Sequence, residues 1–282
     1  MTSPHDEEIL RWREHRVARL TGSDGWLSVV GLAWLEEGEN TVGSDPASKV
    51  PLPSGNVPGR IGVIRVEGGA ATASFLPGSE VTHAGHPVGT LRLNDDSAGE
   101  PTLLRLGSLS FHVIRRRDEL AVRIRDEESP ARKAFTGIDY YPIDPRWRVE
   151  ARFEPYDPPR SVVVPTVLGS EEIYAMPGAM VFSHEGLSQR LEVFLEDGET
   201  DLFIVFGDLT NGSETYGGGR FLYARPPRED GIMVCDFNKA YNPPCVFTPF
   251  ATCAVPLPQN KLPIRVEAGE KLYRGPTVAS FV

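Results

Sequence analysis

The stretch DFNKAYNPPCVFTPFATCAVPLPQNKLP, residues 236–263, matches neither the helical nor the strand pattern. It combines six prolines with polar side chains that include Asp236, Asn238 and Asn242. Proline fixes the backbone, and polar side chains hold irregular segments through hydrogen bonds, so this combination is typical of a rigid loop or a binding site. We predict that this segment, called the strap below, closes a β-barrel and is anchored through Asp236 and Asn238.

Composition limits the classes to which the chain can belong. Its 282 residues are 40% hydrophobic and 24% charged, as in an ordinary soluble globular protein. The net charge of −10 argues against a nucleic-acid partner. No apolar run is long enough to span a membrane, and the acidic N-terminus does not resemble a secretory signal, so we expect a cytoplasmic protein without a membrane partner. Three cysteines, an odd number, fit a reducing compartment.

The N-terminal region, residues 1–40, is predicted to contain one helix and an apolar segment that wraps onto a core. Residues 5–20 carry apolar side chains at helical spacing, with Asp6 as the expected cap and Gly22 at the end. The segment 26–35 is apolar and strand-like, and its two tryptophans indicate a large buried area.

Residues 41–130 read as a β-sandwich. Short β-rich runs follow one another between turn residues at close spacing. The strands are predicted at 41–42, 49–52, 59–66, 70–75, 87–93, 103–106, 108–115 and 119–125.

The order of short motifs in this half resembles a forkhead-associated sandwich. That family reads phosphothreonine with an arginine directly after its first glycine and with a Ser-x-x-His motif. Here Ser44 follows Gly43, and residues 59–62, Gly-Arg-Ile-Gly, stand where Ser-x-x-His would be. The resemblance therefore implies a strand order and not phosphopeptide binding.

Residues 131–282 are predicted to form an antiparallel β-barrel or curled sheet that carries the strap. Gly186, Asp197-Gly198 and Asp230-Gly231 stand at positions suited to hairpin tips. The strands are predicted at 147–153, 161–168, 179–184, 187–195, 201–206, 219–223, 232–235 and 263–268. The boundary with the sandwich is placed near 130–146.

Two charged residues flank the turn at Asn211-Gly212. If their strands pair as a hairpin, Asp208 and Arg220 become near neighbours, and we predict a salt bridge between them. We also expect the strand before Asp236 to pair with the strand of Arg220.

Together these motifs identify the chain as resembling the bacterial and archaeal domain-of-unknown-function 1684 family. The resemblance covers nearly the whole chain and implies no activity, substrate or cofactor. It is carried by Asp208, 214–217, 219–222, 236–245, 251–253, 260–263 and 268–270, with similar early segments at 26–27, 30–32 and 43–46.

Two functions from different classes fit these residues. In the first, the 208–245 region binds an anionic small molecule through Arg220, and Asp236 or Glu214 acts as a catalytic base. In the second, the same side chains are internal anchors, and the strap is a staple in a non-catalytic structural or interaction module. The candidate ligand-binding residues are Arg220, Asn238, Tyr241, Asn242 and Cys245.

Cysteine spacing does not favour a metal site. Cys235, Cys245 and Cys253 lack the close Cys-x-x-Cys spacing of a zinc site, and buried, unreactive thiols are the default interpretation. We therefore predict no metal, and no cofactor is indicated.

Overall fold

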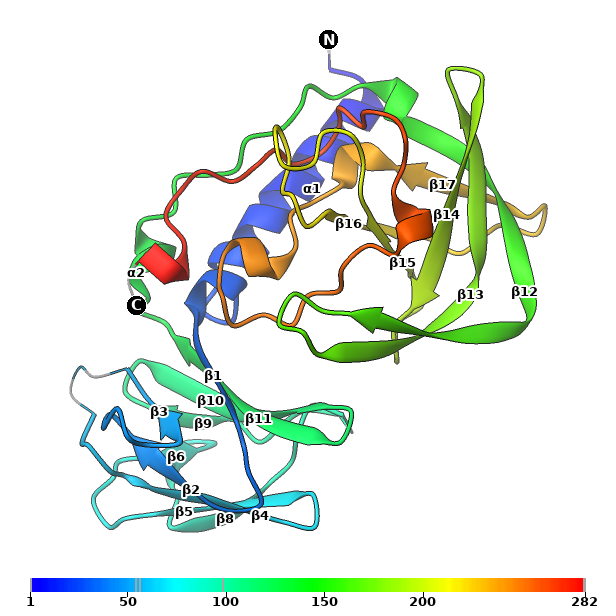
Figure 1. Ribbon diagram of the computed structural model, residues 1–282. Coiled ribbons are helices and arrows are strands. Elements are labelled where there is room, and N and C mark those ends of the chain that lie inside the picture. Colours follow the sequence, from blue (N-terminus) through cyan, green and yellow to red (C-terminus); the bar gives the residue numbers. More distant parts are fainter. Residues whose placement is uncertain (1, 54, 56, 98, 281–282) are drawn as a thin grey trace. The chain divides into compact units, whose positions relative to one another are not determined.

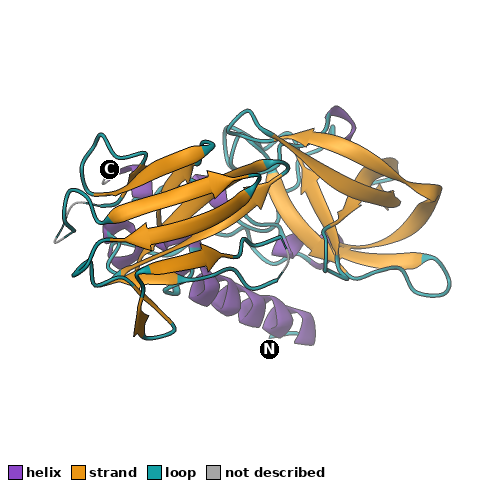
Figure 2. Ribbon diagram, turned by 90° about the horizontal axis from the view of Figure 1, so that it is seen from below, coloured by secondary structure: helices purple, strands orange, loops and turns teal. Residues whose placement is uncertain are grey.

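The computed structural model describes residues 2–53, 55, 57–97 and 99–280. The predicted ranges 1–40, 41–130 and 131–282 each include positions outside the described residues. The chain divides into two compact units, in which strands predominate (Figures 1 and 2). Unit 1 comprises Met1–Ala18, Thr136–Val246 and Ala251–Gly275, and unit 2 comprises Arg19–Phe135, Phe247–Phe250 and Pro276–Val282. Across the described residues, none of the helices has the length and apolar character that crossing a membrane requires.

Unit 2 consists of two sheets. The first has the order β1 (Val29–Trp34), β11 (Glu119–Asp126), β10 (Leu109–Arg116), β9 (Leu104–Leu106), β6 (Thr82–His83), β7 (His86–Pro87). The second has the order β3 (Val50–Pro51), β2 (Gly38–Gly43), β4 (Gly62–Glu67), β5 (Ala70–Phe75), β8 (Thr90–Leu93). Short helical turns are η1 (Trp26–Ser28), α2 (Pro130–Lys133) and η6 (Val278–Ser280).

Both sheets of unit 2 contribute to one apolar core. Ile64 and Ala73 of the second sheet belong to the same buried cluster as Phe111 and Val122 of the first. Strand periodicity explains which residues are buried in this core, because alternate residues of a strand face the same side of the sheet. The predicted sandwich is therefore present.

The N-terminal helix α1 runs from Pro4 to Thr21, close to the predicted 5–20. Its cap differs from the prediction. Ser3 Oγ accepts a hydrogen bond from Asp6 N, and Asp6 Oδ2 accepts one from Ser3 N, so Ser3 caps the helix and Asp6 completes a capping box. Ile9 is fully buried, as the apolar stripe requires. The segment 26–35 forms η1 and then β1, which pairs with β11.

Unit 1 is built on one curled antiparallel sheet. Its order is β16 (Arg220–Ala224), β15 (Leu202–Phe206), β14 (Leu187–Leu195), β13 (Glu171–His184), β12 (Arg148–Pro165), β17 (Ile232–Asp236). The segments predicted as separate strands at 147–153 and 161–168 belong to one long strand, β12, whose register shifts between Pro155 and Arg160. Four short helical turns complete the unit: η2 (Pro145–Trp147), η3 (Phe237–Lys239), η4 (Pro244–Val246) and η5 (Pro258–Asn260).

The strap, and not a strand, closes this curled sheet. The expected pairing of the Asp236 strand with the Arg220 strand is wrong, because β17 pairs with β12. The edge of β16 is met instead by Tyr241 of the strap, which exchanges two backbone hydrogen bonds of 2.9 Å with Phe221. Figure 1 shows the strap, in orange, running across the open side of the curl.

The continuation of the strap, residues 264–271, supplies part of the core of unit 1. Val266 and Ala268 are fully buried in the same apolar cluster as Phe206 and Phe237. The predicted strand at 263–268 is absent, because this extended segment pairs with no strand along its length. Backbone hydrogen bonds hold its two ends, where Leu209 N donates to the carbonyl of Ile264 at 3.0 Å and Glu270 N donates to the carbonyl of Ala240 at 2.8 Å. Side chains bind its middle, as described below.

His112 gives unit 2 a dependence on pH. It lies in β10 and is 6% exposed. Burial, and then the neighbouring guanidinium groups of Arg125, Arg123 and Arg116, lower its pKa from 6.5 to about 4, while Asp96 opposes the shift. In the unfolded chain His112 therefore binds a proton near pH 6.5, whereas in the folded chain it binds one only near pH 4.

We predict that acid destabilises the protein through His112. As pH falls from about 6.5 to 4, the free energy of unfolding decreases by up to about 3 kcal/mol from this residue alone. The His112→Phe variant removes the titration, so its stability declines less over that interval. Urea unfolding at several pH values measures the slope. The exposed His86→Phe variant serves as the control and keeps the wild-type slope; an unchanged slope in His112→Phe contradicts the prediction.

Candidate functional site

A buried ion pair lies where β15 ends and β16 begins. Arg220 Nη2 donates to Asp208 Oδ2 at 2.7 Å, and both side chains are completely buried. Phe206 pairs with Arg220 across the two strands, which brings Asp208, two residues later, within reach. The predicted salt bridge is confirmed. Removing two charges from water is costly, so such a pair is kept only where further hydrogen bonds complete it.

Those further hydrogen bonds hold the continuation of the strap. Arg220 Nη2 donates to the carbonyl of Val266 at 2.8 Å, and Arg220 Nη1 donates to the carbonyl of Ala268. Asp208 Oδ1 accepts from Val266 N at 3.3 Å. The ion pair therefore replaces the missing strand partner of this segment. Because side chains alternate along an extended chain, Arg265 and Glu267 face away from the buried Val266 and Ala268.

Gly219 is the last of three glycines, residues 217–219, before Arg220, and its conformation and surroundings require glycine. Its φ is +91°, and a Cβ atom there would lie 2.4 Å from Pro256 Cγ and 2.7 Å from the carbonyl oxygen of Phe206. The strap therefore packs directly against the backbone of Gly219. A side chain at this position would displace the strap.

Asp236 and Asn238 anchor the start of the strap. Asp236 caps η3 by accepting from Asn238 N at 3.1 Å, and its Oδ2 also accepts from His5 Nε2 at 2.7 Å. Fully buried Asn238 accepts from Asp144 N at 3.0 Å and donates to the carbonyl of Asp144 at 2.9 Å. Asn238 thereby fixes the backbone of a second segment, residues 139–147.

Asn242 and Tyr241 are held from the other side. Asn242 N donates to Glu270 at 2.7 Å, and Asn242 Nδ2 donates to the carbonyl of Lys271 at 2.8 Å. Glu270, fully buried, also accepts from Arg16 of α1 at 3.0 Å. The guanidinium of Arg16 lies 4.5 Å from the centre of the Tyr241 ring. The strap is thus tied to both α1 and its own continuation.

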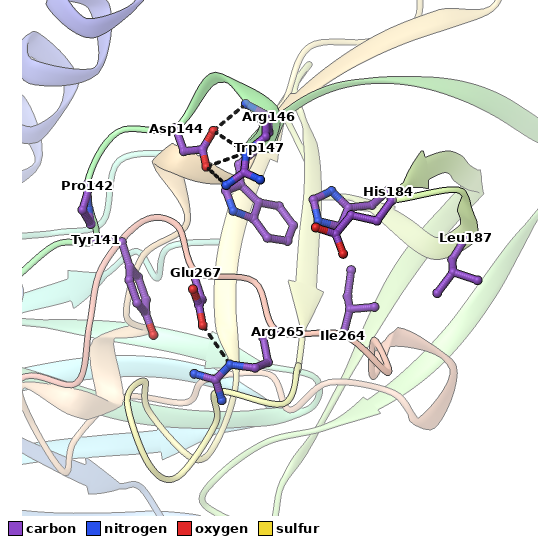
Figure 3. Close-up of a pocket in the computed structure, with 11 residues that line it drawn as sticks. Tyr141, Pro142, Asp144, Arg146, Trp147, His184, Leu187, Ile264, Arg265 and Glu267 are labelled. Carbon is purple, nitrogen blue, oxygen red and sulfur yellow. Dashed lines mark hydrogen bonds and ion pairs between the residues drawn. The ribbon is translucent and has the colours of Figure 1, made fainter.

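The segments held by these anchors surround a pocket of about 510 Å³, called the Trp147 pocket below. Figure 3 shows Tyr141, Glu267 and Arg265 on one side of it and His184, Leu187 and Ile264 on the other. Its lining residues are Tyr141, Pro142, Asp144, Arg146, Trp147, His184, Glu185, Leu187, Ile264, Arg265 and Glu267.

Glu214 connects the predicted region with this pocket. Its carboxylate accepts from the Tyr141 hydroxyl at 2.8 Å and from Arg265, which also donates to Glu267 through Nε at 2.8 Å. The hydrogen bond from Arg265 lowers the pKa of Glu214. Burial, together with the bond to Glu214, raises the pKa of Tyr141 to about 12. At neutral pH the glutamate is therefore ionised and the phenol keeps its proton.

Two stacked rings form the other wall of the pocket. The Trp147 and His184 rings lie 4.1 Å apart with an angle of 17° between their planes. Trp147 is 5% exposed, and its ring also meets the ring of Phe237, at the beginning of the strap, in a T-shaped arrangement with 5.9 Å between the ring centres. Within the described residues, the ring nitrogens of His184 have no hydrogen-bond partner, so they are available to a bound molecule.

None of the seven candidate site residues lines the pocket. Arg220, Asn238 and Asn242 are fully buried; Asp236 caps a turn; and Tyr241 packs against Phe221. Cys245 contacts Tyr216, with 3.7 Å between the sulfur and the hydroxyl, and Glu214 binds two lining residues. Their placement supports an anchoring role for the buried ones and a role at the pocket for Glu214.

The lining residues were missed because they lie in segments that sequence reasoning treated as boundaries or strands. Tyr141 and Asp144 belong to the predicted boundary at 130–146, and Arg265 and Glu267 to the predicted strand at 263–268. One signal was present. The alternation of Arg265 and Glu267 with Val266 and Ala268 places two opposite charges side by side on the face away from the core.

Among the described residues, no group of three or more His, Cys, Asp or Glu side chains is placed so that it could hold a metal ion.

Comparisons with known proteins place most of this site within one family model. The model described as "Protein of unknown function (DUF1684)" matches residues 133–271, which include every lining residue of the pocket. A solution NMR structure of an uncharacterized protein from Haloarcula marismortui is similar at 33% identity, covering 50% of this chain and 78% of that one, with a TM-score of 0.42. None of the curated proteins compared with the chain matches it.

We predict that Arg220→Met destabilises unit 1 by about 3–5 kcal/mol, because Asp208 is left buried without its partner. The double variant Arg220→Met/Asp208→Leu loses less than the sum of the single losses, because no uncompensated charge remains. Urea unfolding followed by tryptophan fluorescence measures these losses.

A matched arginine supplies the control. Arg228 is 56% exposed in an ion pair with Asp230, so Arg228→Met costs at most about 1 kcal/mol. Equal losses for Arg220→Met and Arg228→Met would contradict an anchoring role of the buried pair.

Proposed function

We propose that this chain, which belongs to the DUF1684 family, binds a small polar molecule with an acidic group in the Trp147 pocket. The observation that carries the proposal is the pocket itself, whose charged and aromatic walls are held by buried anchors. Its volume of about 510 Å³ lies within the range typical of small-molecule sites.

Arg265 is the group proposed to bind the acidic part of the ligand. Its Nε and Nη2 atoms donate to Glu267 and Glu214, while Nη1 has no hydrogen-bond partner among the described residues. A guanidinium fixed by two carboxylates presents its remaining donors in one direction, which suits a carboxylate or phosphate. The expectation of an anionic ligand is retained, with Arg265 in the position first given to Arg220.

The charges of the lining favour a ligand that also carries hydrogen-bond donors. Asp144 pairs with Arg146, and Glu267 pairs with Arg265, which leaves Glu185 as an acceptor without a pair among these lining side chains. The nearly balanced lining gives a bare anion little attraction. A flat ligand stacked on His184, with an acidic group at Arg265 and donors elsewhere, satisfies more of these groups.

The protonation states support binding more than acid–base catalysis. A general base works best when its pKa lies near the operating pH. The pKa of Glu214 is lowered by Arg265, and that of Tyr141 is raised to about 12, so both shifts lead away from neutrality. Asp236, the other candidate base, is occupied as a helix cap and as a partner of His5.

A second function, a non-catalytic structural or interaction module, is favoured by the internal pairing of Arg220, Asp208 and Asn238. The two proposed functions predict different effects of substitutions in the pocket. If the strap is only a staple, substitutions that line the pocket leave every measured property of the protein unchanged, whereas those at the anchors reduce stability.

We also propose that the protein acts in the cytoplasm. Within the described residues, Cys235, Cys245 and Cys253 form no disulfide, which supports a reducing compartment.

We predict that a flat, acidic metabolite raises the melting temperature, because a ligand bound only by the folded state stabilises it. A thermal-shift screen of small aromatic carboxylates and phosphate esters, with acetate and inorganic phosphate as ion controls, measures the effect. Titration calorimetry with the best compound then gives the affinity of each variant. Arg265→Ala and His184→Ala each weaken binding roughly tenfold or more, through loss of a charge-assisted hydrogen bond or of ring stacking.

Arg228→Ala is the matched control, because Arg228 is similarly exposed and paired with acids but lies outside the pocket. It keeps wild-type affinity. The proposal fails if no compound stabilises the protein, or if Arg265→Ala and His184→Ala bind the best compound as tightly as the wild type.

A further inference from the structure

Two cysteines eight residues apart meet in the strap. Cys245 lies in η4, and its backbone N donates to Cys253 Sγ at 3.2 Å. A hydrogen bond with the Cys253 thiol is the main cause that holds the pKa of Cys245 below its ordinary value. The sequence spacing suggested unreactive buried thiols, but the fold places the Cys253 sulfur against the backbone of Cys245.

The backbone on both sides of this pair is fixed. On the side of Cys245, Val246 N donates to the carbonyl of Pro243 at 3.0 Å, and Asn242 is bound to Glu270. On the side of Cys253, its carbonyl accepts from Val167 N at 2.9 Å at the tip of the β12–β13 hairpin. The two thiols therefore meet without a search through loop conformations.

The two cysteines differ in exposure, as a reacting and a resolving thiol require. Cys245 is partly exposed, whereas Cys253 is buried, with 5% of its surface exposed. Cys245 Sγ donates to the hydroxyl of Tyr216 at 3.7 Å, and the hydrogen bond with this hydroxyl also lowers the pKa of Cys245. Cys235, by contrast, is fully buried, and burial raises the pKa of its thiol.

We propose that Cys245 and Cys253 form a modification site at which hydrogen peroxide makes an intramolecular disulfide. The Cys245 thiolate attacks one peroxide oxygen, the O–O bond breaks, and hydroxide leaves and is protonated to water, which gives Cys245 sulfenic acid. The Cys253 thiol then loses its proton and attacks Cys245 Sγ, and a second water leaves. Both thiols are oxidised by two electrons in total, and peroxide is reduced to two waters.

The disulfide would close a ring around residues 246–252. The chain leaves unit 1 after Val246 and re-enters it at Ala251, so the bond would join the two ends of this excursion. Reduction by a thiol would open the ring again. The site thus gives the fold a covalent tie that depends on the redox state, independently of any ligand in the Trp147 pocket.

The test treats the reduced full-length protein with stoichiometric hydrogen peroxide. The expected product is a monomer that has lost two hydrogen atoms by intact mass, with one free thiol left of three. The tryptic peptide 240–261, which contains both Cys245 and Cys253, is the one that is lighter by two hydrogen atoms. Cys253→Ser instead accumulates a sulfenic acid at Cys245 that dimedone traps. The buried Cys235→Ser variant behaves like the wild type.

Wild-type protein alone suffices to overturn the proposal. A peptide map in which Cys235 is linked, or in which disulfides join separate chains, contradicts it. So does retention of three free thiols after peroxide treatment. Trapping of sulfenic acid at Cys253 and not at Cys245 in the matched serine variants would reverse the assigned roles and also reject it.

Discussion

The buried ion pair of Arg220 and Asp208 is the interaction on which unit 1 depends. Unlike a surface pair, it is enclosed on all sides, and its guanidinium and carboxylate also bind the backbone of Val266 and Ala268. The pair therefore forms hydrogen bonds to this backbone that a neighbouring strand would otherwise form. An apolar replacement could fill the same volume but could not satisfy these carbonyls, which explains why a costly charge pair occupies the core.

The other anchors of the strap follow the same principle. Asn238 holds the backbone at Asp144, and Asn260 donates to the carbonyls of Glu192 and Val205 at 2.9 Å. Both are fully buried amides; Asn238 pairs with the backbone of an irregular segment, and Asn260 of η5 pairs with the backbone of β14 and β15. Through these amides, irregular segments acquire fixed positions, and fixed positions are what a binding pocket between loops requires.

The same chain segments therefore provide both the internal anchors and the residues that line the pocket. The anchors bury their polar groups on one side of the chain, and the alternate side chains, such as Arg265 and Glu267, are presented on the other. The reactive pair Cys245 and Cys253 also owes its contact to this rigid path. A loop held less firmly would give neither a defined pocket wall nor a defined thiol pair.

The sequence by itself determined the β class, the N-terminal helix, the family and the Asp208–Arg220 pair, because these depend on local periodicity, on a long specific motif or on a short hairpin. Only the tertiary structure decided that β17 pairs with β12 and that the pocket lies beside the motif. The reason is physical. The contacts of an irregular segment are set by individual side-chain to backbone hydrogen bonds between distant residues, which leave no period in the sequence.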